Sequence, residues 1–201
     1  MIFRDLVRAT LLVAVLALSP DVSAAFGPNE TFKKGTFVLS AEGGGGVQNG
    51  IDEHREPGLE FWNAGVRFSL LPFGPSFSGG PFYGALEVGL EPYYQRYQKP
   101  VHAFYGGLGL MLRYHVLSLG RFVPYLEVFS AVGGTDLKRE ELNSTFAFLL
   151  HGGAGASFFV TDTVALYAGY RLEHVSNGNT SKPNRGFESH TGVAGVSFFF
   201  P

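Results

Sequence analysis

The chain has 201 residues, room for one domain, and no cysteine, which excludes disulfides and thiolate metal sites. Its formal net charge of -2 and the lack of long runs of like charge give no indication of a nucleic-acid partner. Glycine (28 residues) and phenylalanine (20 residues) are both abundant, which favours sheets with close backbone approach over helical bundles.

The N-terminal segment has the pattern of a secretory signal. Arg4 and Arg8 supply positive charge, residues 9–18 form an apolar run interrupted only by Thr10, and small residues follow it. A helix that crosses a bilayer needs roughly 20 apolar residues, so this shorter run predicts a cleaved signal peptide over 1–25 rather than an N-terminal anchor. The mature domain is expected to span 26–201, where no segment is apolar for about 18 residues in a row.

Alternating segments fill the chain from residue 36 onward. Segments of about ten residues separated by turn residues are typical of transmembrane β-barrels, in which successive side chains point to lipid and to the interior. The sequence predicts strands over residues 36–42, 58–70, 84–97, 102–116, 121–135, 144–161, 163–176 and 187–200.

The two faces of these segments differ in chemistry. In segment 102–116, Leu108 and Leu110 share one face, whereas Arg113 and His115 share the other. A soluble lipocalin-like barrel would turn its apolar face inward, but this face is continuous and rich in phenylalanine, which suits contact with hydrocarbon. We therefore predict an all-β fold, an eight-stranded antiparallel transmembrane β-barrel whose interior is filled with side chains.

The predicted interior holds charges of both signs, which must pair with one another to be tolerated there. Glu173 is expected to pair with Arg171 or with a cross-strand arginine. The predicted interior charges are Arg67, Glu87, Glu91, Arg113, Glu127, Arg171 and Glu173.

The order of the strands also predicts the connections. With both termini periplasmic, the stretches 43–57, 136–143 and 177–186 are external, and the tight Thr161–Asp162 connection is periplasmic. The stretch 43–57 contains a run of glycines and a cluster of charges, and we expect it to be a flexible loop.

A polar cluster interrupts the apolar face at the external end of the seventh predicted strand. Alternation puts His174 and Ser176 on the lipid-facing side and Glu173 inside. A histidine beside a serine can activate the hydroxyl as a nucleophile, and a carboxylate should orient the imidazole. Alternation in the last strand puts Glu188 on the outer face, opposite His174 if Ser176 pairs near Gly186. The simpler alternative is an interfacial group that only forms hydrogen bonds at the level of the lipid headgroups.

This polar stretch resembles the PagL family of outer-membrane lipid A 3-O-deacylases. In that family a His-x-Ser-Asn segment supplies the base and the nucleophile, and a glutamate fourteen positions after the histidine completes a triad. The motif covers residues 174–188, and the eight-stranded layout extends the resemblance over the mature chain. The matching residues are His174-Val175-Ser176-Asn177-Gly178, Pro183-Asn184-Arg185-Gly186 and Glu188.

The resemblance implies hydrolysis of the ester-linked acyl chain at position 3 of lipid A, the membrane anchor of lipopolysaccharide. The enzyme would lie in the bacterial outer membrane, with its active site on the outer barrel surface facing the outer leaflet. His174 would be the base, Ser176 the nucleophile and Glu188 the orienting carboxylate, with no metal or cofactor.

Other residues of the motif are candidates for supporting roles. Donors for the oxyanion are expected in the backbone near Asn177 and Gly178 or in the Asn184 amide. Gly178 suits a turn that needs a positive φ. Lys182 and Arg185 are either contacts for lipid A phosphates or ordinary charges of an external loop.

Two other functions stay open from the sequence. An outer-membrane phospholipase A would also place serine and histidine near the lipid surface, but with asparagine as the third member and calcium at the oxyanion; no acidic calcium loop surrounds 174–188. A non-enzymatic small barrel would have its function in the loop 43–57. The six histidines are scattered without the spacing of a metal site. Whether the chain forms a homodimer is also left open.

Overall fold

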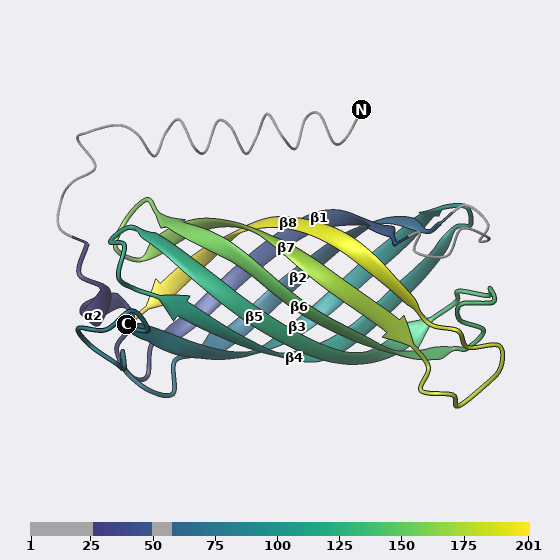
Figure 1. Ribbon diagram of the computed structural model, residues 1–201, viewed down its shortest axis with the longest axis horizontal. Coiled ribbons are helices and arrows are strands. Elements are labelled where there is room, and N and C mark those ends of the chain that lie inside the picture. Colours follow the sequence, from purple (N-terminus) through teal and green to yellow (C-terminus); the bar gives the residue numbers. More distant parts are fainter. Residues whose placement is uncertain (1–25, 50–57) are drawn as a thin grey trace.

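The computed structural model describes residues 26–49 and 58–201 (Figure 1). The predicted signal peptide over 1–25 lies outside the described residues, as do positions 50–57 of the predicted first loop. Within the described part, no helix is both long enough and apolar enough to cross a membrane. A short helix, α2 (Pro28–Thr31), precedes the strands.

Eight strands form a closed barrel. Each strand pairs antiparallel with the next along the chain, and β8 pairs with β1 to complete the ring. The predicted all-β, eight-stranded antiparallel barrel is therefore confirmed. The strands are β1 (Phe37–Gln48), β2 (Glu60–Leu70), β3 (Gly84–Lys99), β4 (Ala103–Val116), β5 (Phe122–Thr135), β6 (Phe146–Phe159), β7 (Val164–Ser176) and β8 (Phe187–Phe200).

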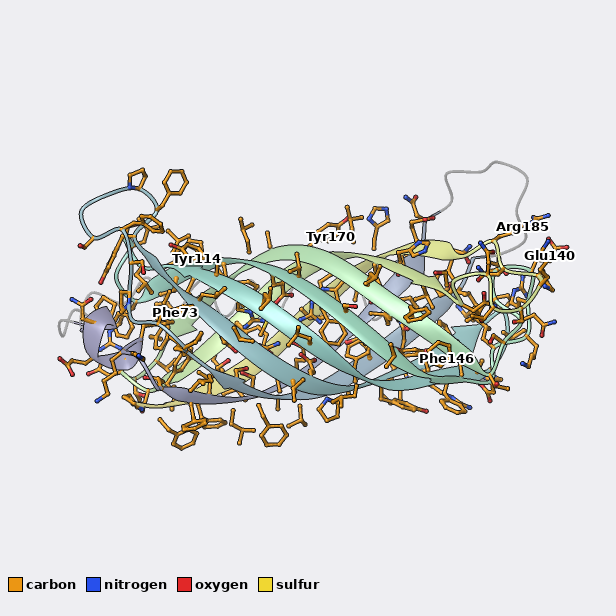
Figure 2. All side chains as sticks on the ribbon, turned by 90° about the horizontal axis from the view of Figure 1, so that it is seen from below. Phe73, Tyr114, Glu140, Phe146, Tyr170 and Arg185 are labelled. Atoms are coloured by element: carbon orange, nitrogen blue, oxygen red, sulfur yellow. The ribbon has the colours of Figure 1, made fainter. Side chains whose placement is uncertain are left out.

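The two faces of the wall separate apolar from polar side chains, as alternation predicts. Leu108 and Leu110 on β4 are exposed on the outside, whereas Arg113 and His115 on the same strand are buried inside. Figure 2 shows side chains standing out from the wall along the length of the barrel. Large apolar side chains exposed on the described strands include Phe37, Trp62, Phe68, Leu90, Leu126, Val128, Leu166, Tyr170 and Phe200. Closure pairs both edges of each of the eight described strands, so this apolar surface is compatible with hydrocarbon.

The first strand is longer than predicted. β1 continues through the run of glycines as far as Gln48, so the expected external loop from residue 43 onward is wrong for its first part. Glycines have no side chains to alternate, so the period that identifies a strand is lost there. Close packing explains the glycine at position 44, because a Cβ on Gly44 would lie 2.2 Å from the Gly192 carbonyl oxygen.

Charged side chains fill the interior and pair across it. Arg171 donates from Nε to Glu127 at 2.6 Å and from a terminal nitrogen to Glu42 at 2.8 Å. Arg113 contacts the same Glu127 carboxylate at 2.7 Å. Buried charges persist when they are paired and hydrogen-bonded, so this network fits the filled interior of a small barrel. The predicted interior charges are all buried: Arg67, Glu87, Glu91, Arg113, Glu127, Arg171 and Glu173.

Glu173 has a different partner from the one predicted. Its carboxylate accepts a hydrogen bond from Gln95 Nε2 at 2.7 Å and a longer one from Ser189 Oγ at 3.5 Å. Arg171 lies on the same face of β7, but its long side chain reaches to Glu42 and Glu127 instead. The expected ion pair between Glu173 and an arginine is therefore wrong, because neutral polar groups of β3 and β8 donate to one oxygen of this carboxylate instead.

The two ends of the barrel differ. Figure 1 shows α2 and the C-terminus at one end, which we call the terminal end, and the β7–β8 connection at the other, which we call the loop end. At the terminal end, Phe32 packs against Phe159 with ring centroids 5.6 Å apart. The β6–β7 connection at that end is tight as predicted, since Val160 N–H donates to the Val164 carbonyl at 2.9 Å.

Cysteine labelling checks which face of the wall meets lipid. Leu108 is 51% exposed and Met111 is 0% exposed on the same strand, so Leu108→Cys should react with a lipid-soluble thiol probe and Met111→Cys should not. Gly109→Cys is unsuitable as the interior variant, because a Cβ added at position 109 would lie 2.3 Å from the Phe129 ring. The chain has no other cysteine, so the labelled fraction measured by mass spectrometry is unambiguous. Reaction of Leu108→Cys with a charged aqueous probe in membranes would contradict the lipid-facing assignment.

Candidate active site

The outer face at the loop end brings together His174 and Glu188. Antiparallel pairing of β7 with β8 sets the two residues directly opposite each other. The His174 Nδ1 atom lies 3.0 Å from Glu188 Oε1, and both side chains are partly exposed on the outside of the barrel. The pairing predicted from alternation and register is confirmed. A carboxylate in this position fixes the imidazole ring and favours the tautomer with its proton on Nδ1.

Ser176 lies on the same outer face, two residues beyond His174. Residues at that spacing on a strand are roughly 6.7 Å apart at their Cα atoms. Among the described residues, no hydrogen bond joins the Ser176 hydroxyl to the imidazole. Catalytic hydrogen bonds are often long without substrate and shorten when the substrate binds.

Gly186 leaves room for the imidazole of His174 at the level of Ser176. Since Val175 pairs with Phe187, the adjacent Gly186 is at the level of Ser176. A Cβ on Gly186 would lie 3.0 Å from His174 Cε1 and 3.5 Å from Nε2, so the ring edge that carries Nε2 lies beside this glycine. Gly186 also has a φ of 68°, which strains other residues. Glycine is therefore favoured at position 186 for two reasons. The backbone there has a positive φ, and a side chain would crowd the imidazole of His174.

The β7–β8 connection, residues 177–186, begins with a compact turn. Thr180 N–H donates to the Asn177 carbonyl at 3.3 Å, and Gly178 and Asn179 between them both have a φ of 62°. Two central residues at positive φ are characteristic of a type I′ turn, which glycine and asparagine favour. The expected positive φ at Gly178 is confirmed, and Asn179 takes the second left-handed position.

The sequence-predicted oxyanion groups have different environments. The Asn177 backbone N–H donates to Asn184 Oδ1 at 2.9 Å, and the Asn184 amide nitrogen donates to Asn179 Oδ1 at 3.2 Å. The buried Asn177 side chain donates to the Ser181 carbonyl at 3.0 Å. Asn177 and Asn184 therefore hold the connection together. The Gly178 N–H has no hydrogen-bond acceptor within the described part of the chain, which leaves it available to a ligand.

A second loop braces this connection from the side. Gly186 N–H donates to the Glu141 carbonyl at 2.9 Å, and Asn143 N–H donates to the Pro183 carbonyl at 3.1 Å. Arg185 also pairs with Glu140 at 2.9 Å, and Figure 2 shows the two labelled residues near each other at the loop end. The β5–β6 connection thus supports the site, a role that sequence reasoning missed because contacts between loops have no period. Arg185 is neutralised in part by Glu140.

The surroundings of the serine and histidine are apolar on one side and polar on the other. Phe148 pairs with Ser176 from β6, and its ring would contact a Cβ on Gly178 at 3.2 Å. Toward the middle of the barrel, Tyr170 is hydrogen-bonded to His190 on the outer face. A hydrogen-bond partner on a neighbouring strand, such as this tyrosine, cannot be read from the pattern along one strand.

The described residues contain no group of three His, Cys, Asp or Glu side chains able to hold a metal ion. The groups gathered on the outer wall are a hydroxyl, an imidazole and a carboxylate. Such a set can carry out nucleophilic acyl transfer when the three are aligned with a substrate.

The closed eight-stranded barrel has an apolar outer wall and a filled interior, which define an outer-membrane β-barrel. The His174–Glu188 pair lies on that outer wall. The family model described as Lipid A 3-O-deacylase (PagL) matches residues 62–197, and the chain belongs to this family. The match runs from β2 into β8 and includes all the candidate site residues. No curated protein matches the chain.

Two solved structures share the fold. The crystal structure of Neisserial surface protein A is 19% identical with a TM-score of 0.59, over 83% of this chain and 100% of that one. The crystal structure of the outer membrane enzyme PagL is 17% identical with a TM-score of 0.58, over 79% of this chain and 97% of that one. One is described as a surface protein and the other as an enzyme, so the fold alone does not determine the activity.

Proposed function

We propose that this protein hydrolyses the ester-linked acyl chain at position 3 of lipid A through Ser176, His174 and Glu188. The observation that carries the proposal is the 3.0 Å hydrogen bond between His174 and Glu188 on the lipid-facing wall. A polar pair at such a position is energetically costly, so its presence points to a function. Family membership supplies the substrate class, since the matching model describes lipid A 3-O-deacylases.

The proposed reaction follows the logic of a serine hydrolase. His174 Nε2 takes the proton of the Ser176 hydroxyl as its oxygen attacks the ester carbonyl, and the resulting imidazolium is stabilised by Glu188. Collapse of the tetrahedral intermediate breaks the bond to the sugar oxygen, which leaves as a hydroxyl after it takes the proton from His174, and an acyl-serine remains. Water activated by the same imidazole then releases the fatty acid. The free N–H of Gly178 is the nearest candidate in sequence to donate to the oxyanion.

We also propose that the loop end faces the outside of the cell. The helix α2 before the first strand and the C-terminus lie at the opposite end, and in barrels of this type the termini are periplasmic. The site then lies at the level of the outer leaflet, where lipid A is located. Lys182 and Arg185 at this end would be close to the lipid A phosphates.

Mass spectrometry of lipid A tests the proposal. Cells that produce the protein should contain lipid A lighter by the one acyl chain that is ester-linked at position 3, and matched cells without it should not. Release of fatty acid from glycerophospholipids with unchanged lipid A would instead identify a phospholipase, for which the third group is expected to be asparagine rather than Glu188. No change in either lipid would indicate a non-enzymatic barrel.

A further inference from the structure

The β2–β3 connection, residues 71–83, differs from the other connections at the terminal end. We call it the aromatic loop. It contains no Asp, Glu, Lys, Arg or His. The β4–β5 and β6–β7 connections are charged, and Arg121 of the first pairs with Asp162 of the second at 3.1 Å. An uncharged segment beside two charged ones indicates a different environment.

Large aromatic side chains dominate the surface of the aromatic loop. Phe73, Phe77 and Phe82 are 60%, 70% and 72% exposed. Three exposed phenylalanines within one short uncharged segment leave a substantial apolar area uncovered, which is unfavourable in water. This loop therefore needs an apolar environment outside the protein.

The aromatic loop lies beside the wall of the barrel and not across its mouth. Tyr114, which stands on the outer face of β4, donates its hydroxyl to the Phe82 carbonyl at 2.6 Å. Figures 1 and 2 both show the connection projecting sideways past the wall at the terminal end. Phe82 therefore lies next to the apolar outer surface of the barrel, and the loop that carries Phe73 and Phe77 projects beside the same wall.

The backbone holds the aromatic loop in a defined shape. Ser76 and Gly84 exchange backbone hydrogen bonds of 2.8 and 3.1 Å, and Gly80 N–H donates to the Phe77 carbonyl at 3.1 Å. Phe77 has a φ of 58°, in the left-handed region that a bulky residue rarely adopts. A phenylalanine at a position that glycine would occupy without strain suggests a requirement for the ring itself.

We propose that the aromatic loop anchors the barrel in the membrane leaflet at its terminal end. Phe73, Phe77 and Phe82 lie among the upper acyl chains of the lipids, next to the headgroups. Phenylalanine side chains of interfacial segments are buried at the boundary between headgroups and acyl chains. The absence of charge means that binding needs no anionic lipid, so a neutral bilayer is sufficient. The loop fixes the depth of the barrel, independently of the chemistry proposed at the loop end.

Fluorescence quenching in vesicles tests the anchor. The only tryptophan, Trp62, is replaced by phenylalanine, and Phe77→Trp is introduced into the full barrel in phosphatidylcholine vesicles. Phosphatidylcholine brominated near the top of its acyl chains should remove most of the emission, and iodide should remove little. Thr163→Trp, in the charged β6–β7 connection, is the matched control and should respond to iodide and not to bromine.

Two results would overturn the anchor. Equal iodide quenching of Phe77→Trp and Thr163→Trp would place the ring in water. Protection of Phe77→Trp from both quenchers would place the ring against protein, such as a second copy of the chain. Phe82→Trp in the same background repeats the measurement if Phe77→Trp does not fold.

Discussion

Ser176→Ala is expected to remove lipid A deacylation while leaving a folded, heat-modifiable barrel. The proposed nucleophile is lost, and removal of the nucleophile from a triad lowers kcat by roughly 10⁴–10⁶-fold. The side chain is on the outer face beside Phe148, so the smaller residue leaves the interior unchanged. The measurement is the initial rate of fatty acid release from lipid A by purified protein.

A serine elsewhere at the loop end serves as the control for this variant. Ser144→Ala removes only a hydroxyl that accepts from Phe146 N–H at 3.1 Å, so near-normal activity is expected. Ser181 is less suitable, because its hydroxyl bonds to the Asn177 side chain at 2.9 Å and to the Asn143 carbonyl. Near-normal deacylation by a folded Ser176→Ala variant would rule out the covalent mechanism.

Glu188→Ala is expected to lower kcat by about 10⁴-fold in an equally stable barrel. The carboxylate holds His174 at 3.0 Å and would stabilise the imidazolium that forms as the serine attacks. Glu188 is exposed on the outside, so its removal leaves no buried group unpaired. Deacylation rate and thermal unfolding in detergent are measured side by side.

Glu173→Ala is the matched control, because the two glutamates lie on opposite faces of the wall. Loss of Glu173 leaves Gln95 without its buried acceptor, which should cost about 1–3 kcal/mol of stability. Activity per folded barrel should change little. A stable but inactive Glu173→Ala variant together with an active Glu188→Ala variant would reverse the proposed assignment.

Alternation of side chains made much of this protein predictable from its sequence. A period of two fixes which face each residue occupies, so the outward position of His174 and Glu188 and the inward position of Glu173 followed directly. The same rule could not identify the part of β1 made of consecutive glycines. It also could not find partners across space, so the Gln95–Glu173 hydrogen bond and the contacts between Glu141 and Gly186 appear only in the structure.

The position of His174 and Glu188 on the wall, instead of in the lumen, has a kinetic consequence. A substrate that remains in its leaflet reaches them by lateral diffusion, in two dimensions. The proposed reaction should therefore saturate with the mole fraction of substrate in the bilayer or detergent micelle, and not with its bulk concentration. Diluting the substrate with inert amphiphile at constant total substrate should slow turnover, although neither the protein nor the amount of substrate has changed.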